Sequence, residues 1–116
     1  MVKILMSDEA ERDLEQIGDY IAETLKNPQA ALDTIRGIKK AIGKLEDFPL
    51  IGTPLSSLVD VDTDYRCVGY GNYLAFYRPE GNNVYVDRVL YSKRNYIAVI
   101  LGTMQNDMDP DASKAK

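Results

Sequence analysis

The 116-residue chain has no histidine, no tryptophan and a single cysteine. Without histidine it lacks the usual general base and the imidazole of a serine or cysteine triad. The common zinc sites are excluded as well, because they need several cysteines or histidines. A lone cysteine cannot form a disulfide within the chain. Any acid or base must be Asp, Glu, Lys, Tyr or a perturbed Arg, and we expect neither a metal nor a cofactor.

Long apolar runs are also missing. Residues 1–6 form too short an apolar run for a signal peptide, and no stretch approaches the roughly 18 apolar residues of a membrane span. We therefore expect a cytoplasmic protein with no membrane contact. A composition of 45% apolar and 28% charged residues is typical of one globular domain. We expect this domain over residues 1–102 and a polar, flexible tail over residues 103–116.

Charge is unevenly distributed along a chain whose formal net charge is -4. Residues 1–25 carry seven acids against two bases, and residues 46–64 carry five acids and no base. Residues 66–94 reverse the sign, with five bases against two acids. An acidic chain is a poor candidate for holding nucleic acid through a generally basic surface. Residues 66–94 therefore form a basic segment around the candidate site described below.

Two amphipathic helices are predicted after a short strand at residues 2–6. Ser7 is a good N-cap for the first helix, and Asn27 followed by Pro28 begins the second. Apolar side chains then repeat at spacings of three and four, the helical period. The two stripes are Ala10, Leu14, Ile17, Ile21 and Leu25, and Ala31, Ile35, Ile38, Ile42 and Leu45. The first helix should end near Lys26, and so short a connection predicts an antiparallel helical hairpin.

Strand signals follow from residue 65 onward. Residues 65–69, 73–78 and 84–91 are rich in aromatic and β-branched side chains, and Gly and Asn mark the turns between them. One or two helical turns are expected at residues 95–101. The predicted fold is α+β in the order β-α-α-β-β-β. The first strand joins an antiparallel sheet, the hairpin packs on one sheet face, and a short helix ends the domain.

The strongest candidate site follows the last strand, where basic and phenolic side chains gather: Arg88, Tyr91, Lys93, Arg94 and Tyr96. Arg and Lys offer positive charge to a phosphate or oxyanion, and Tyr offers a proton donor and a stacking face. Arg88 should share a sheet face with Val84, Val86 and Leu90 by the period of two. It therefore needs either an Asp or Glu partner from the helices or a direct role at a substrate.

Other patterns are weaker. The basic stripe of the second helix, Arg36, Lys39, Lys40 and Lys44, fits either a nucleic-acid face or an ordinary solvated surface. The alternating aspartates at 60, 62 and 64 imitate a calcium loop but lack its glycine and final glutamate. Cys67 fits a packed thiol better than a nucleophile. We read Tyr65, Tyr73, Tyr77 and Tyr85 mainly as packing residues.

Motifs in a fixed order over about residues 2–101 resemble the RelE/ParE superfamily of small toxins from bacterial type II toxin-antitoxin systems. No single motif is specific, but the ordered set is. The matching residues are Ser7, Asp8, Glu9, Ala10, Asp13, Leu14, Ile17, Tyr20 and Ile21; Asn27, Pro28, Ala30, Ala31, Leu45, Phe48, Pro49 and Gly52; Tyr65, Arg66 and residues 72–78; and residues 88–91 with 93–96.

The resemblance implies a growth-inhibiting toxin that a cognate antitoxin silences by covering its active surface, so that the two chains form a hetero-oligomer. ParE-like members poison DNA gyrase without being nucleases, whereas RelE-like members cut messenger RNA in the ribosomal A site. Fold alone does not choose between them. We expect ParE-like poisoning of a target such as DNA gyrase, and the alternative is a metal-independent, ribosome-dependent mRNA endoribonuclease. Whether the chain is an enzyme stays open.

The resemblance also suggests roles for individual residues. Arg94 matches the arginine just after the last strand of RelE-like toxins, and Arg66 matches the arginine that opens the second sheet strand of ParE-like ones. In a nuclease, Lys93 or a tyrosine would transfer protons while the two arginines held the phosphate. Tyr91 and Tyr96 are the tyrosines available for that role. The same five side chains could instead form a surface that binds the target.

Two departures from the nuclease pattern favour the ParE-like alternative. RelE-like nucleases usually carry lysines before the second strand, but residues 53–65 contain three aspartates and no base. Ile100 stands about where their C-terminal catalytic tyrosine is expected. The low pI of about 4.8 is also unlike a protein that must approach the phosphate surface of a ribosome.

Overall fold

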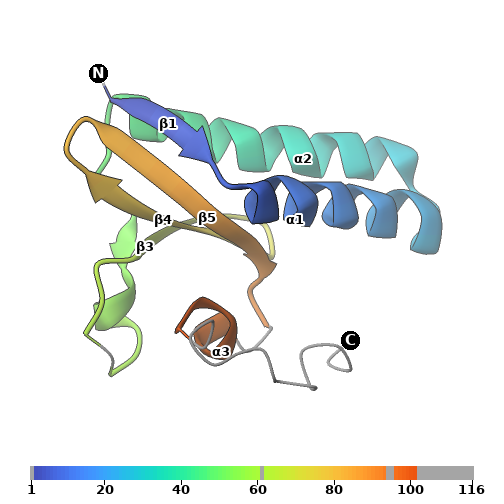
Figure 1. The fold of residues 1–116 in the computed structure, drawn as a ribbon. Helices are drawn as coiled ribbons and strands as arrows, with labels where there is room; N and C mark the ends of the chain where they lie inside the picture. Colours follow the sequence, from blue (N-terminus) through green and yellow to red (C-terminus); the bar gives the residue numbers. More distant parts are fainter. Residues whose placement is uncertain (1, 61, 94–95, 102–116) are drawn as a thin grey trace.

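The computed structural model describes residues 2–60, 62–93 and 96–101, and the expected tail lies outside this part (Figure 1). In chain order its main elements are β1 (Lys3–Met6), α1 (Asp8–Asp19), a π-helical turn (Tyr20–Thr24), α2 (Pro28–Gly43), β2 (Thr53–Pro54), β3 (Arg66–Tyr70), β4 (Tyr73–Glu80), β5 (Asn83–Tyr91) and α3 (Tyr96–Leu101). Short 3-10 turns lie at Lys44–Glu46 and Leu55–Ser57. The predicted α+β fold, with a helical hairpin on a sheet, is confirmed.

The strands form one five-stranded sheet in the order β1-β5-β4-β3-β2. β1 runs parallel to β5, and the other neighbours are antiparallel. The prediction of a wholly antiparallel sheet is therefore wrong for β1. The chain leaves β1 directly into the hairpin and crosses back to the sheet, which is the connection that a parallel neighbour requires. The two-residue edge strand β2 was also not predicted.

Both helix caps are confirmed. The Ser7 hydroxyl accepts a hydrogen bond of 2.9 Å from the Ala10 N–H, and the Asn27 side chain accepts one of 3.0 Å from the Ala30 N–H. The first helix does not continue regularly to Lys26, because residues 20–24 form a π-helical turn that the Leu25 N–H closes by donating to the Tyr20 carbonyl. This wider turn shifts the helical register. Leu25 is consequently exposed, and its predicted place in the apolar stripe is wrong.

The sheet separates two apolar cores. The larger core packs the hairpin on the sheet and contains Leu14, Ile38, Ile42, Leu45 and Tyr77 among its buried members. The smaller core lies on the opposite face and consists of Leu55, Cys67, Phe76, Leu90 and Ile100. Figure 1 shows α1 and α2 on one side of the sheet and α3 on the other. Within the described residues, no helix is long and apolar enough to cross a membrane.

A β-bulge changes the side-chain pattern of β5. Phe76 pairs with Arg88, but its neighbour Tyr77 pairs with Val86, so Asp87 is an extra residue. Such a bulge reverses which positions face each side of the sheet. Val84 and Val86 therefore lie in the larger core, whereas Leu90 lies in the smaller one. The prediction that all three share one face is wrong.

Of the two alternatives predicted for Arg88, the acidic partner from a helix is the one that the structure shows. The Arg88 Nε and Nη2 donate hydrogen bonds of 2.8 and 2.9 Å to the two carboxylate oxygens of Asp13 on α1. Asp13 also accepts a 2.8 Å hydrogen bond from the Val89 N–H. β1 ends at Met6, so it has no residue whose carbonyl could accept a hydrogen bond from the Val89 N–H of β5. The Asp13 carboxylate takes the place of that missing carbonyl. The ion pair raises the pKa of Arg88 further above its usual range.

Replacing Asp13 by Ala should lower the free energy of unfolding by about 3 kcal/mol, because it leaves a mostly buried guanidinium and a strand N–H without their acceptor. Urea denaturation of the purified protein measures the change. Glu15→Ala, at an exposed position of the same helix, is the matched control and should change stability by less than about 0.5 kcal/mol. Equal losses in the two variants would show that the ion pair does not anchor α1.

Candidate functional site

Arg66 lies at the β2 side of the sheet and is engaged within the protein. Its Nη1 donates to the carbonyl oxygens of Leu50, at 3.1 Å, and Gly52, at 2.8 Å. The residue opens β3 and pairs with Pro54 on one side and Tyr77 on the other. The guanidinium thus holds the loop that leads into β2. If Arg66 also bound a phosphate, as predicted, its guanidinium would have to bind the phosphate and these carbonyls together.

Tyr77 holds the same loop from inside the larger core. Its ring is fully buried, its hydroxyl donates to the Pro49 carbonyl at 2.8 Å, and the Gly52 N–H donates to that hydroxyl at 2.9 Å. Burial is the main reason that the pKa of Tyr77 is raised. A Cβ on Gly52 would lie 2.6 Å from the Tyr77 hydroxyl and 2.8 Å from the Cys67 carbonyl oxygen. Only glycine fits at this close approach.

Four tyrosines gather at the other end of the sheet, and we call them the tyrosine cluster: Tyr20, Tyr70, Tyr73 and Tyr91. Tyr73 pairs with Tyr70 on one side and with Tyr91 on the other, which places all three on one sheet face. The Tyr73 and Tyr91 ring centroids are 5.8 Å apart. Burial, then the nearby Tyr91 and Tyr20, raises the pKa of Tyr73. Tyr20, Tyr70 and Tyr91 are each about half exposed.

A glycine in α2 makes room for this cluster. The Tyr70 ring lies over Gly37, where a Cβ would come within 2.4 Å of three ring atoms. The ring therefore packs closely against the helix backbone, and Tyr70 remains partly exposed. Sequence reasoning missed Tyr20 and Tyr70 as members of a site. The signal was the position of Tyr70 and Tyr73 on either side of a tight turn, which makes them cross-strand neighbours.

The remaining predicted site residues lie in different environments. Lys93 is exposed two residues after Tyr91, whereas Arg94 lies outside the described residues. Tyr96 packs in the smaller core, with its ring centroid 5.1 Å from that of Phe76 on the opposite sheet face. Arg66 is separated from Tyr70 by four residues along β3, or about 13 Å. Among the described members of the predicted set, Arg66 and Tyr96 lie apart from Tyr91, and Lys93 follows Tyr91 by two positions in the chain.

A second polar network holds the bulge and was not predicted. The Tyr65 hydroxyl donates to the Asp87 carboxylate at 2.7 Å, and the Arg78 Nε donates to the same oxygen at 2.9 Å. The Arg78 guanidinium also lies 5.2 Å from the centre of the Tyr85 ring. Burial, then the hydrogen bond to Asp87, raises the pKa of Tyr65 to about 12. The network explains Tyr65 and Tyr85 as structural residues.

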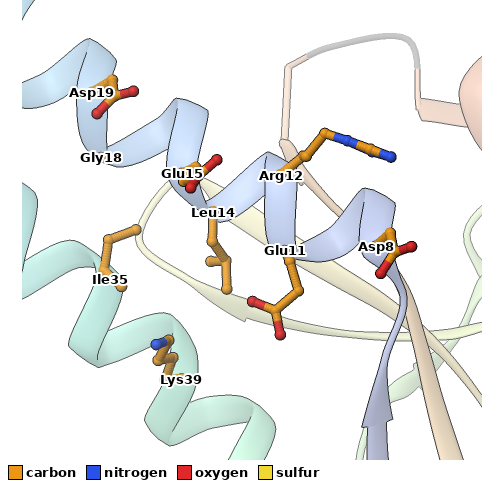
Figure 2. A pocket seen from close by; sticks show the side chains of 9 residues that line it. All are labelled: Asp8, Glu11, Arg12, Leu14, Glu15, Gly18, Asp19, Ile35 and Lys39. Atoms are coloured by element: carbon orange, nitrogen blue, oxygen red, sulfur yellow. The ribbon is translucent and has the colours of Figure 1, made fainter.

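The hairpin carries a groove between α1 and α2 with a volume of about 680 Å³ (Figure 2). Leu14, Gly18 and Ile35 give it an apolar part. Its charged lining is mostly acidic and comprises Asp8, Glu11, Glu15 and Asp19 with Arg12 and Lys39. None of the predicted site residues lines it, and its carboxylates would repel a phosphate. Within the described residues, no group of three or more acidic or cysteine side chains could hold a metal ion.

Two helices packed on one face of a five-stranded mixed sheet define a small α+β domain. The chain aligns with a solved structure of the chromosomal ParDE toxin-antitoxin system from P. aeruginosa, with a TM-score of 0.67 and 21% sequence identity. The match covers 80% of this chain and 98% of that chain, and at this identity it shows the fold. The model of the family described as ParE toxin of type II toxin-antitoxin system, parDE, matches residues 4–96. The chain belongs to this family. No curated protein matches the sequence.

Gly52→Ala should lower the free energy of unfolding by about 1–3 kcal/mol, because the new methyl group must displace a buried ring or a strand carbonyl. Gly43→Ala is the matched control, since nothing lies within 4 Å of its Cβ position. Gly43 is helical, so its replacement should be neutral or stabilise the protein by about 0.5–1 kcal/mol. Thermal and urea unfolding measure both changes, and equal effects would contradict the close packing of Gly52.

The Tyr65 network should give a stability difference that depends on pH. The phenol ionises near its ordinary pKa of 10.0 when unfolded and near 12 when folded. Between these values the folded state binds more protons, so the contribution of Tyr65 is complete below pH 10 and is lost as the pH rises toward 12. The stability difference between wild type and Tyr65→Phe should shrink over this window. A difference that stays constant to pH 12 would contradict the raised pKa.

Proposed function

We propose that this toxin inhibits bacterial growth by binding and poisoning a target such as DNA gyrase, using the tyrosine cluster and Lys93 as its contact surface. We also propose that a cognate antitoxin neutralises it in the cytoplasm, where the target is found. Membership of the ParE family supports the mode of action. The observation that carries the proposal is the separation of Arg66 and Tyr96 from Tyr91 among the candidate nuclease residues that the structure describes.

RNA cleavage needs a base, an acid and a cation arranged around one phosphate, each within hydrogen-bonding distance of its reacting atom. Here Arg66 is bound to loop carbonyls and stands about 13 Å along the β3 backbone from Tyr70, and Tyr96 packs on the opposite face of the sheet. Arg88 is bound to Asp13. This separation supports binding without hydrolysis.

The tyrosine cluster has the character of a protein-binding surface. Tyrosine supplies a large apolar ring with a polar tip and is enriched among the residues that dominate binding energy at interfaces. Tyr91 and Tyr70 are 44% and 43% exposed, although both rings are positioned by neighbours. A positioned aromatic surface loses little side-chain freedom when it binds. Lys93 adds one positive charge beside it.

The double variant Tyr91→Ala/Lys93→Ala should lose growth inhibition when expressed without antitoxin, while it keeps the wild-type circular dichroism spectrum. In vitro, wild-type protein should inhibit gyrase supercoiling and accumulate cleaved DNA, and the double variant should be at least about tenfold less potent. Lys40→Ala, which removes an exposed lysine from α2 instead, should retain full potency.

The same preparations should be added to a purified translation reaction, with message ends mapped by primer extension. We expect intact messages with and without ribosomes. New message ends that require ribosomes, together with unaffected gyrase, would replace the proposal by the RelE-like endoribonuclease. Unchanged growth on expression of the wild-type chain alone would reject both modes of toxicity.

A further inference from the structure

Three large apolar side chains are exposed in the connection between α2 and β2. Phe48, Leu50 and Ile51 are exposed to 61%, 62% and 57%, and they lie within four consecutive positions that we call the apolar loop (residues 48–51). Single exposed apolar residues are normal on a protein surface, but a contiguous group marks an interaction site. The loop lies at the β2 side of the sheet, away from the tyrosine cluster.

Hydrogen bonds within the protein hold the backbone of the apolar loop in one conformation. Buried Tyr77 holds the Pro49 carbonyl, Arg66 holds the Leu50 carbonyl, and the Ile51 N–H donates to the Phe48 carbonyl at 3.1 Å. These bonds orient the backbone, but they leave the apolar side chains in solvent. A surface that is already ordered loses little conformational freedom on binding, which is the property of a docking site.

The surrounding sequence is acidic, and its charges are unpaired. Glu46 and Asp47 directly precede the apolar loop, and Asp60, Asp62 and Asp64 follow in the connection to β3. All five are exposed, and none of them takes part in an ion pair with another described residue. The nearest bases in the sequence are Lys44, which is exposed, and Arg66, whose Nη1 donates to loop carbonyls. The apolar loop therefore directly follows two exposed carboxylates, those of Glu46 and Asp47.

This combination restricts the partner. A second copy would bring the same carboxylates face to face, and nucleic acid or an anionic membrane would be repelled. Pro54 interrupts the edge strand, so a partner would bind through side chains rather than by adding a strand. The charge favours a polypeptide with apolar side chains flanked by Lys or Arg.

We infer that the apolar loop docks a segment of the cognate antitoxin in which apolar side chains are flanked by lysine or arginine. The inference rests on the proposed function, because it assumes an antitoxin partner. A lasting complex suits this surface better than a transient contact with the target, since permanent interfaces are the more apolar ones. The antitoxin contact at this loop would be separate from the tyrosine cluster that meets the target.

The test measures binding of the purified antitoxin to the full-length toxin by isothermal titration calorimetry. The triple variant Phe48→Ser/Leu50→Ser/Ile51→Ser should bind with an affinity at least about tenfold lower, because it removes the apolar contacts. Leu25→Ser/Leu32→Ser is the control, since these side chains are similarly exposed, at 54% and 51%, on the helical hairpin. It should change the affinity by less than about threefold. Circular dichroism verifies that all variants are folded.

A second variant tests the charge. Glu46→Gln/Asp47→Asn should weaken binding and reduce its dependence on salt, because two attractive charges are lost from the rim. Unchanged affinity in the triple variant, or an equal loss in the Leu25/Leu32 control, would overturn the inference. Loss of growth inhibition with unchanged antitoxin affinity would also overturn it, since the loop would then serve the target.

Failure of the proposed function gives a different result. In that case wild-type protein expressed alone would leave growth and gyrase unaffected, while the triple variant would still lose affinity for the antitoxin. The docking site would then stand without the proposed target.

Discussion

The carboxylate of Asp13 joins the helical layer to the sheet, and the candidate surface depends on this contact. It binds both the Arg88 guanidinium and the Val89 N–H at the point where β1 has ended. The pair follows directly after the bulge at Asp87, whose carbonyl accepts a 2.8 Å hydrogen bond from the Ser7 hydroxyl. One edge of the bulge is thus held by the start of α1. Removing these contacts would free the strand edge and the helix together.

The bulge also decides where Tyr91 points. Without the extra residue, positions 84, 86 and 88 of β5 would share a face, and Tyr91 would lie on the other one. With it, Tyr91 pairs with Tyr73 and joins the row that continues to Tyr70. Asp87 can be accommodated because Tyr65 and Arg78 satisfy its carboxylate. A polar network on one face of the sheet therefore helps to assemble an aromatic surface on the other face.

Local signals were enough to predict much of the fold. The caps at Ser7 and Asn27 and the apolar stripes gave the two helices, and aromatic and β-branched runs gave β3, β4 and β5. The isolated charge of Arg88 within an apolar strand indicated an acidic partner from a helix as one of two alternatives, and Asp13 is that partner.

The remaining features depend on contacts between distant parts of the chain. The parallel pairing of β1, the two-residue strand β2 and the bulge have no local sequence signal, because each is set by its neighbours in the sheet. Because of the bulge, Leu90 lies on the sheet face opposite to the one predicted. For the same reason the period of two did not predict that Tyr91 lies in one row with Tyr73 and Tyr70. The π-helical turn likewise moved Leu25 out of a regular apolar stripe. The candidate site was the least predictable part, since its members come from three strands and a helical turn.

The contacts of the arginines determine how much of the positive charge of residues 66–94 is available to a partner. Residues 66–94 are a basic segment of the sequence, but Arg66 is engaged with carbonyls, Arg78 with Asp87 and Arg88 with Asp13. In the described part of that segment, Lys93 is left as the base without such an interior role. Meanwhile the carboxylates of the groove and of the β2–β3 connection remain at the surface. The basic segment therefore offers less free positive charge than its sequence implied. Such a surface selects basic polypeptides over nucleic acid, so recognition should rest on protein contacts at two separate places: the tyrosine cluster and the apolar loop.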